Sequence, residues 1–408
     1  MSRRFAIQLI AINVYAFALS FLWQTLQPLI VPYLVARLEP SFKNTFLGLI
    51  TAAGLVVATI VQPLAGGLSD RSRSRWGRRR PYILFGTVGD LVFLAMIALA
   101  GNYWVLFAAY CLLQTSSNIA HGPYQGFIPD LVPDNKKGLA SGVKNLVELL
   151  AMVLGSAIIG SLLGRDQVGA SLFAIGAVLF VTMLITMVLV REQRAQGDAE
   201  ATAVPPLSLS GVITGLRQHS VFGWYVLSRF LILMGLAAVR TFAQNYIQDV
   251  LHADNPAALA GQLMTVLGVA VLVVVLPAGY LADRFGRKRL NVLSAAIGAI
   301  GTLLMLDVGS FNDLVMYGAI VGVAIGIFMS ANWALAMDLI PAGEAALFLG
   351  LTNLATAGSG AAAGLLGPLI DVVNHSLPGQ GYNMLFVASA VFWAAGGLIL
   401  LCLPLKKR

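Results

Sequence analysis

The chain has 408 residues, of which 58% are hydrophobic and only 11% are charged, and its mean hydropathy is +0.83. A soluble domain contains about 25% charged residues, so this composition excludes an ordinary soluble protein. The net charge of +8 would suit a nucleic-acid-binding protein, but the positions of the basic residues argue against that function.

Charged clusters divide the chain into apolar runs that are each long enough to cross a bilayer as a tilted helix. Twelve such runs lie at about 6–36, 44–69, 82–101, 103–130, 139–163, 168–191, 220–249, 258–282, 290–308, 313–338, 345–371 and 381–403. We therefore expect an all-α membrane protein with twelve transmembrane helices.

Most of the 26 Lys and Arg residues fall on one side of these helices when both termini are placed in the cytoplasm. This bias is the positive-inside pattern of an inserted membrane protein. It predicts a multi-pass protein of the cell (inner) membrane with both termini cytoplasmic, in contact with lipids and not with nucleic acid. The run that follows Met1 is too long for a signal peptide, so we expect the first helix to remain in the protein.

The two halves of the chain repeat each other. Asp70-Arg71 and the later Gly77-Arg-Arg-Arg correspond to Asp283-Arg284 and Gly286-Arg-Lys-Arg, and Asp130-Leu-Val-Pro corresponds to Asp338-Leu-Ile-Pro. Internal repeats of membrane helices with a binding site at the repeat interface are typical of secondary transporters. We predict an N-terminal six-helix bundle (1–191), a cytoplasmic linker (192–218) and a C-terminal six-helix bundle (219–408).

Several kinds of chemistry lack the residues that they require. No G-x-x-x-x-G-K-[ST] loop is present, so ATP is not bound by that device. Cys111 and Cys402 both lie in apolar runs, which indicates neither a disulfide framework nor a metal site. Without a Ser/His/Asp or metal constellation we expect no enzyme activity and no cofactor, with a proton as the candidate coupling ion. We expect a monomer.

The doubled G-x-x-x-D-R loop with its following G-R-[KR]-[KR] resembles the signature of the major facilitator superfamily. In the first copy, Gln62-Pro, Ser69-Asp-Arg and the stretch 74–81 are similar to the loop of sucrose transporters and glycoside–pentoside–hexuronide symporters. That resemblance implies a sugar or glycoside substrate. This chain departs from those families at Gln62, Gln114 and Gln125, where they carry charged residues. Either the proton site has moved or the chain is not a symporter.

Charged residues at the ends of the repeated loops are candidates for gates that lock one conformation. They are Asp70, Arg71, Arg78, Asp283, Arg284 and Arg287. A carboxylate at these positions can pair with loop arginines and is favoured near a helix N-terminus by about 0.3–1 kcal/mol. Alternatively, the arginines only fix the topology.

Ionisable residues inside the spans cost about 2.5–3.5 kcal/mol each and indicate function by default. Our coupling candidates are Asp90, Lys144, Glu148 and Arg240. Lys144 and Glu148 are spaced to pair on one helix face, so Glu148 could be only a structural partner, and Lys144 and Arg229 could extend to the inner surface.

Amides and aromatic side chains on the first, fourth, seventh and tenth helices suit a sugar, whose hydroxyls need donors and acceptors. The predicted substrate-binding residues are Trp23, Gln24, Gln27, Asn118, Tyr124, Gln125, Arg240, Asn245, Asn332 and Trp333. Each amide could instead bond to a neighbouring helix. His121 and Gln244 lie in the same stretches, and we expect His121 to be packed and neutral.

The leading interpretation is an alternating-access sugar transporter, coupled to protons through Asp90, Glu148 and Arg240. Two alternatives remain open. The neutral Gln62 and Gln114 favour an uncoupled sugar facilitator, and the Met-rich and aromatic interior favours a proton-antiport exporter of amphipathic compounds.

Overall fold

The computed structural model describes residues 3–72, 74, 76–190, 192, 220–339 and 345–404. In the first half of the chain the helices are α1 (Arg3–Thr25), η1 (Leu26–Ile30), α2 (Val31–Leu38), η2 (Pro40–Phe42), α3 (Lys43–Asp70), α4 (Arg80–Ala98), α5 (Tyr103–Gln125), α6 (Phe127–Leu131), η3 (Asp134–Lys136), α7 (Lys137–Leu163) and α8 (Val168–Leu189). In the second half they are α10 (Ser220–Asp249), α11 (Pro256–Phe285), α12 (Arg287–Leu304), η4 (Met305–Asp307), α13 (Phe311–Leu339), α14 (Ala345–Gly364), α15 (Gly367–Ser376) and α16 (Gln380–Cys402).

The all-α membrane fold expected from the sequence is confirmed. Eleven helical segments in the described residues are long and apolar enough to cross a membrane. The remaining expected span is α5, which has ample length but a run of polar side chains at 114–118. Most of these side chains are buried, so they lower the mean hydropathy of α5 without facing lipid.

The chain divides into two compact units. The first contains Met1–Pro40 and Ala53–Thr202, and the second contains Ser41–Ala52 and Ala203–Arg408. Helix α3 runs through both units, because its first turns group with the second unit. The linker predicted at 192–218 lies, apart from Glu192, outside the described residues, so its limits stay a prediction.

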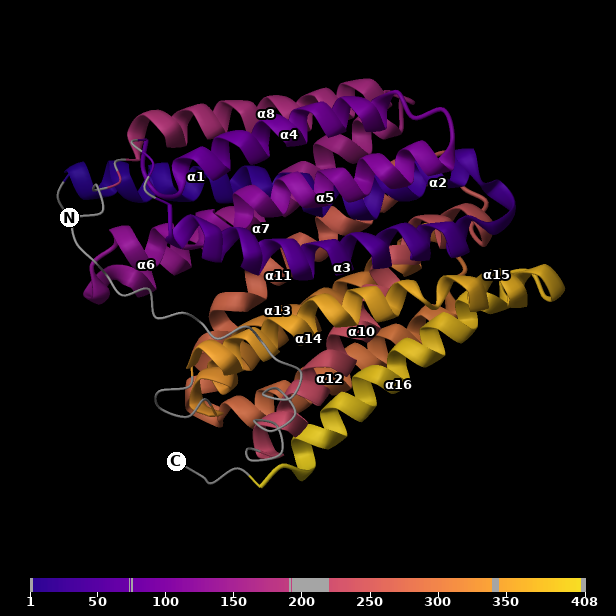
Figure 1. Ribbon diagram of the computed structural model, residues 1–408. Coiled ribbons are helices and arrows are strands. Elements are labelled where there is room, and N and C mark those ends of the chain that lie inside the picture. The colour runs from indigo at the N-terminus through magenta and orange to yellow at the C-terminus, as the bar shows by residue number, and fades with distance from the viewer. Residues whose placement is uncertain are drawn as a thin grey trace. The chain divides into compact units, whose positions relative to one another are not determined.

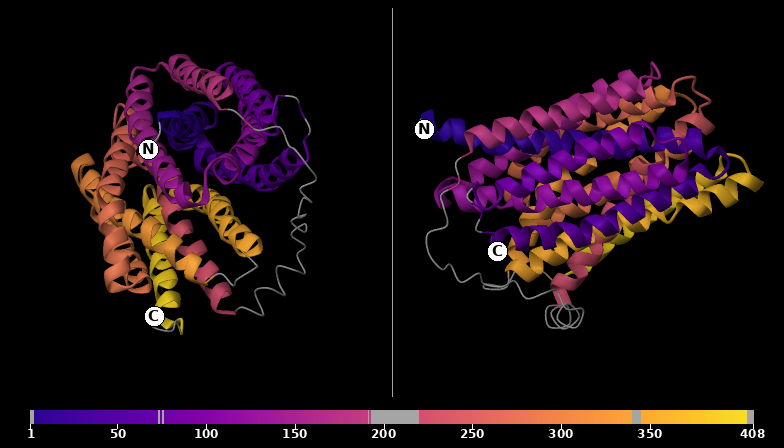
Figure 2. Two further views of the ribbon diagram at one scale, coloured as in Figure 1. Left: turned by 90° about the vertical axis from the view of Figure 1, so that its left-hand side faces the viewer. Right: turned by 45° about the horizontal axis from the view of Figure 1, so that its top comes forward.

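Helices at corresponding places in the two units pack in the same pairs. In the first unit α1 contacts α7 and α8, and α4 contacts α5 and α8. In the second unit α10 contacts α14 and α16, and α12 contacts α13 and α16. Within each unit the helices run side by side (Figures 1 and 2). The internal repeat seen in the sequence is therefore also a repeat of packing.

A π-helical turn interrupts the first span at Leu26–Ile30. It contains Pro28, which has no N–H to donate and whose ring would collide with the preceding turn of a regular α-helix. A wider turn relieves that collision, and such turns are frequent at functional sites. Gln27, a predicted substrate-binding residue, lies in this turn and is half-buried.

Glycines allow neighbouring helices to approach closely. A Cβ added to Gly122 of α5 would lie 2.3 Å from the carbonyl oxygen of Gln62 on α3. That oxygen belongs to the backbone of a helix, so it cannot move aside cheaply. Small residues at such positions let membrane helices pack backbone to backbone.

We expect Gly122→Ala to lower the free energy of unfolding by about 1–3 kcal/mol, the usual cost of overpacking. Gly142→Ala is the matched control, because nothing lies within 4 Å of a Cβ added there. Alanine also has the higher helix propensity, so the control should be neutral or stabilising. Thermal unfolding of both purified variants checks this, and equal stability would contradict the close approach of α3 and α5.

Candidate functional site

In the first unit, one arginine joins the ends of three helices. Arg79 lies just before α4, and its guanidinium contacts the carboxylates of Asp70 at 3.0 Å and Asp130 at 2.7 Å. It also donates to the carbonyl oxygen of Pro123 at 3.2 Å. Arg78 adds a second ion pair with Asp130, at 2.7 Å. Arg79 is nearly buried while Asp70 is half-exposed, so the cation lies deeper in the bundle than this carboxylate.

A carboxylate caps the N-terminus of α4. The backbone N–H groups of Arg78, Arg79 and Arg80 all donate to Glu192, at 2.5–3.0 Å in their shortest contacts. Gly77 precedes them with φ of +108°, a conformation that favours glycine. The free N–H groups and the positive end of the helix dipole make this a favourable place for a negative charge.

The second unit contains the same arrangement of one arginine between two carboxylates. Arg287 contacts Asp338 at 2.7 Å and Asp283 at 3.2 Å, and it donates to the carbonyl oxygen of Ala334 at 3.1 Å. Arg287 follows Arg79 by the same 208 positions that separate Asp338 from Asp130. The repeat has therefore kept the three charges together in both units.

These two triads contain three of the six predicted gate residues, namely Asp70, Asp283 and Arg287, and a fourth, Arg78, pairs with Asp130 of the first triad. Arg71 and Arg284 are exposed and lie outside them, and Arg284 packs on the ring of Phe285 instead. Sequence reasoning missed Arg79, Asp130 and Asp338, although their constant offset was a usable signal. That the triads act as gates stays a prediction.

Asp90, a predicted coupling residue, is fully buried in α4. Its Oδ1 accepts a hydrogen bond from the Ser116 hydroxyl of α5 at 2.5 Å. Its Oδ2 is buried and has no hydrogen-bond partner among the described residues. One turn earlier, Thr87 bonds to the hydroxyl of Tyr15 on α1 at 2.6 Å. Asp90 thus lies between α4 and α5 with one neutral partner.

Lys144 and Glu148 form the ion pair that their spacing on α7 predicts, with 2.8 Å between Nζ and Oε1. Both side chains are partly exposed. The pair satisfies both charges locally, so a coupling role for either residue stays a prediction.

Part of the predicted pocket on the first and fourth spans forms a connected polar run. Trp23 donates to the Ser117 hydroxyl at 3.1 Å and lies edge-on to Tyr110. Gln114 donates to the Tyr110 hydroxyl at 3.2 Å, and Asn118 donates to the backbone oxygen of Gln114 at 2.7 Å. Most of these groups are therefore already bonded to one another.

The other predicted residues on α5 have different surroundings. Tyr124 packs in the hydrophobic core of the first unit, edge-on to Tyr15 and Phe127. Gln125 is exposed and bonds to His121 at 3.3 Å. The structure therefore does not bring Tyr124 and Gln125 to the polar run that Trp23 and Asn118 share.

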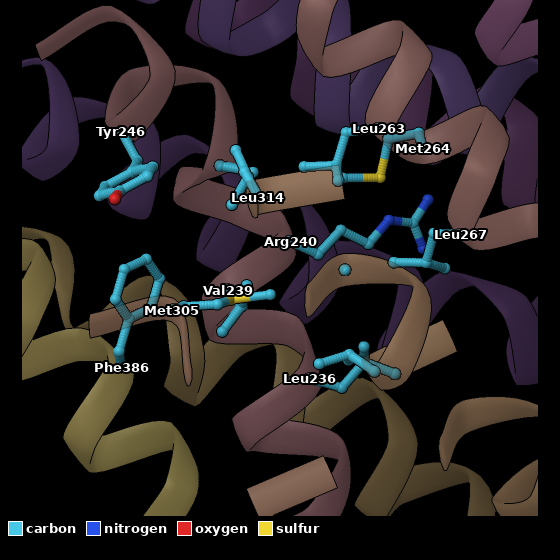
Figure 3. Close-up of a pocket in the computed structure, with 13 residues that line it drawn as sticks. Leu236, Val239, Arg240, Tyr246, Leu263, Met264, Leu267, Met305, Leu314 and Phe386 are labelled. Carbon is cyan, nitrogen blue, oxygen red and sulfur yellow. The ribbon is translucent and has the colours of Figure 1, made fainter. Parts of the chain in front are cut away.

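Arg240 of α10 lines a pocket inside the second unit whose other walls are almost entirely apolar. The lining residues come from α10, α11, α13, η4 and α16: Leu236, Val239, Ala243, Tyr246, Leu263, Met264, Leu267, Met305, Leu314, Gly318, Val321 and Phe386. Figure 3 shows the guanidinium of Arg240 beside Leu267 and Met264, with Tyr246 and Phe386 at the opposite side. The surface that faces this pocket is apolar, with aliphatic, thioether and aromatic side chains around Arg240.

Arg229 lies in the first half of α10, is partly buried and bonds to two other helices. Its Nη1 donates to Oδ1 of Asn332 on α13, and its Nη2 donates to the Thr356 hydroxyl of α14 at 3.1 Å. The Tyr225 hydroxyl also donates to Oδ1 of Asn332, at 2.8 Å. That Arg229 only snorkels to the inner surface stays an alternative, although its guanidinium is bonded to side chains of two other helices. Trp333, next to Asn332, is 45% exposed.

A polar cluster joins the start of α3 to α10 and α15 within the second unit. Asp371 of α15 accepts hydrogen bonds from the side chain of Asn44 at 2.8 Å and from the N–H and hydroxyl of Thr45 at 2.7 Å each. Lys43 pairs with Asp249 at 2.5 Å. Asn245 donates to Asn44 at 2.8 Å, so this predicted pocket residue lies in the α3 cluster, away from Arg229. Any movement of α3 against α15 must break these bonds.

We expect Arg79→Gln to lower the unfolding temperature and Arg71→Gln to leave it nearly unchanged. The first substitution leaves Asp70 and Asp130 without their shared cation in a partly buried site, whereas Arg71 is exposed. Thermal unfolding of the two variants checks this. Equal effects would show that the triad contributes no more than a surface charge.

The pKa of Asp130, in the short helix α6 that follows α5, gives a second prediction. Burial opposes its ionisation, but hydrogen bonds and charge from Arg79 and Arg78 outweigh burial and lower the pKa below its usual value of 3.8. Because the pKa is lower in the folded chain, ionised Asp130 stabilises the fold at neutral pH, and this contribution is lost as the pH falls through the lowered value. Asp130→Asn should therefore lower the unfolding temperature at neutral pH, and the difference from the unmodified chain should shrink below pH ~4. A difference that does not change with pH would contradict this account.

Comparison with known proteins gives the family. The sequence profile of the Major Facilitator Superfamily matches residues 7–365. The chain is 24% identical to multidrug resistance protein MdtG of Enterobacter lignolyticus (strain SCF1) and of Klebsiella pneumoniae (strain 342) over 317 residues, which is 74% of this chain and 72–73% of those proteins. These relatives are multidrug resistance proteins and not members of the sugar-transporter branch that the first loop resembles.

Solved structures show the same fold. A mutant form of the nucleoside transporter NupG superposes with a TM-score of 0.78 at 14% identity, covering 97% of this chain and all of that one. A bacterial homolog of the human lysosomal transporter Spinster, inward-facing and unoccupied, gives a TM-score of 0.73 at 14% identity, covering 98% of this chain and 97% of that one. With its repeated bundles, its duplicated charge triads and a profile match over most of its length, this chain belongs to the Major Facilitator Superfamily.

Proposed function

We propose that this transporter exports amphipathic compounds in exchange for protons. The relatives named as multidrug resistance proteins align with 74% of this chain at 24% identity, which supports an exporter over a sugar importer. Such a protein needs a group that takes up and releases a proton inside the membrane, and it needs apolar surface for its cargo.

Asp90 is the observation that carries the proposal. An ionised carboxylate buried without a cation is costly, and the described partner of Asp90 is a neutral hydroxyl. In this conformation we place a proton on its buried Oδ2, which has no other hydrogen-bond partner among the described residues. Release of that proton requires a conformation in which water reaches Asp90, and this requirement links protonation to alternating access.

The cavity beside Arg240, about 30 Å³ in this conformation, is lined by apolar side chains that would suit an amphipathic cargo once the cavity widens. Ligand sites are mostly apolar with a few polar groups that fix orientation, and methionines such as Met264 and Met305 adapt to irregular shapes. A sugar would leave most of its hydroxyls without partners among these side chains.

Proton-coupled sugar symport is the second candidate, and the polar run of Trp23, Gln114 and Asn118 favours it. Tryptophan and amides are suited to a sugar ring and its hydroxyls. In this conformation, however, Trp23 bonds to Ser117 and Asn118 bonds to Gln114, so a sugar would have to displace these bonds.

Inside-out membrane vesicles with an acidified interior test the proposal, with a pH-sensitive dye to follow the gradient. A transported compound admits protons back across the membrane and dissipates the gradient. We expect amphipathic naphthalene derivatives to dissipate it and sucrose or maltose to have no effect. In Asp90→Asn the dissipation should fall to the level of vesicles that lack the protein.

Asp254→Asn is the control for the loss of one carboxylate, because Asp254 is exposed in a loop. It should behave like the unmodified chain. Dissipation by sugars alone, added outside the vesicles, would make the cargo of the exchanger a sugar. A proton–sugar symporter would instead dissipate the gradient only when the sugar is loaded inside the vesicles, and that result would replace the exporter with the symporter. Full dissipation in Asp90→Asn would remove the carboxylate from the coupling mechanism.

A further inference from the structure

We infer that the cluster around Arg229 is a binding site for the anionic group of the cargo, so that the transported compounds are amphipathic anions. This inference rests on the proposed function and gives it a substrate class. Its evidence is a set of unused hydrogen-bond donors around one partly buried cation.

The charge of Arg229 is not balanced by a carboxylate among the described residues. An arginine offers five N–H donors. Here Nη1 reaches Oδ1 of Asn332 and Nη2 reaches the hydroxyl of Thr356, both neutral oxygens. The buried Nε has no hydrogen-bond partner in the described part of the chain. On one side the guanidinium lies over the ring of Phe328, 5.9 Å from its centroid.

Asn332 supplies the second, independent observation. Its side chain is fully buried, and its Oδ1 accepts from both Tyr225 and Arg229. Its Nδ2 is buried and has no hydrogen-bond partner among the described residues. Buried polar groups are rarely left unpaired, because each costs free energy. Within the described residues, Arg229 and Asn332 therefore each have an N–H group without an acceptor, and no carboxylate pairs with the cation.

An oxyanion meets these requirements. A carboxylate or sulfonate has several lone pairs, and its charge-assisted bonds to a guanidinium are stronger than those of neutral acceptors. A cationic cargo would be repelled by Arg229. The buried ring of Phe328 packs on the guanidinium, and the exposed Trp333 follows Asn332 in α13, so aromatic side chains on this helix fit an anion attached to an apolar body.

Arg229 sits between three helices of the second unit, which is suitable for a site that opens and closes. The partners lie on α13 and α14, and Tyr225 fixes Asn332 from the same helix as Arg229. Arg229 is only partly buried, whereas its unused Nε and the Nδ2 of Asn332 are buried, so a ligand must reach these donors through an opening between the three helices. If Arg229 formed a salt bridge with a carboxylate of the chain, these N–H donors would already be bonded.

Three naphthalene compounds that differ mainly in charge test the inference on the purified protein. They are naphthalene-2-sulfonate, neutral naphthalene-2-sulfonamide and the cation (2-naphthylmethyl)trimethylammonium, and equilibrium binding is measured by calorimetry in a detergent with neutral headgroups. We expect the sulfonate to bind at least tenfold more tightly than the sulfonamide, and the cation to bind most weakly. Equal binding of sulfonate and sulfonamide would overturn the inference.

Variants then assign the preference to this cluster. Arg229→Gln should abolish the preference for the anion, and Arg229→Lys should keep part of it. Asn332→Asp places a carboxylate beside Arg229, so it should abolish anion binding while the ion pair preserves the fold. Arg289→Gln, which removes an exposed arginine, should change nothing. An unchanged preference in both Arg229→Gln and Asn332→Asp would refute the site.

Two further measurements distinguish a lipid site and an uncoupled carrier from a proton-coupled anion exporter. If dioctanoyl phosphatidylglycerol binds to the Arg229 site and the sulfonate does not, the site holds a lipid headgroup and the cargo assignment fails. Binding does not depend on a proton gradient. If the sulfonate binds selectively but does not dissipate the gradient, proton-coupled export is refuted and the anion site stands. If the sulfonamide or the cation dissipates the gradient and the sulfonate does not, the anion assignment is refuted and proton-coupled export stands.

Discussion

Charged groups inside a bilayer must find their partners within the protein, because hydrocarbon offers neither hydrogen bonds nor a high dielectric constant. Several ionisable side chains in the described part of the chain obey that constraint with a partner of opposite charge. Lys144 and Glu148 pair on one helix face, and Lys43 pairs with Asp249 at the start of α3. Asp90 and Arg229 depart from the pattern, since each meets only neutral partners among the described residues. Such a group is stabilised when its charge is neutralised, by a proton on Asp90 or by an anion beside Arg229. Both residues are therefore suited to function.

The same constraint explains the duplicated triads. One guanidinium has enough donors in a fixed fork to hold two carboxylates and a backbone oxygen at once, which an ammonium group does less well. Arg79 and Arg287 do this in their respective units. The loops before them differ in length, yet the three charges meet in the same way. The longer first loop has an additional contact, because it directs the N–H groups of residues 78–80 toward Glu192.

The sequence predicted the fold well because helix length and polarity alone determine which segments can cross a bilayer. All twelve expected spans correspond to helical segments. A search by hydropathy misses α5, because its polar run lowers the mean hydropathy of the helix. The pairing of Lys144 with Glu148 followed from local spacing. Repeats were equally visible, because aligned motifs need no knowledge of side-chain geometry.

The site was predicted less well because its contacts join helices that are far apart in the sequence. The bond between Asp90 and Ser116 depends on how α4 packs on α5, and nothing in either segment indicates it. Asn245 was grouped with pocket residues by its helix, but its partner is Asn44, about 200 positions away. Arg229 near a helix end looks like a snorkelling residue until the positions of Asn332 and Thr356 are known. The resemblance to sugar transporters rested on loop residues, and loops that hold a bundle together say little about its cargo.

An anionic cargo changes the energetics of the proposed exchange. A monoanion leaving a cell whose interior is negative moves down the electrical gradient, and a proton entering in exchange moves down it too. Each elementary charge that crosses is worth about 2.3 kcal/mol per 100 mV, so one such cycle gains about 4.6 kcal/mol per 100 mV from the potential alone. Exchange of a proton for a neutral compound gains half as much, and exchange for a monovalent cation gains nothing. A buried carboxyl that carries protons and an arginine that carries anions are therefore the pair of groups that lets an antiporter use the membrane potential twice.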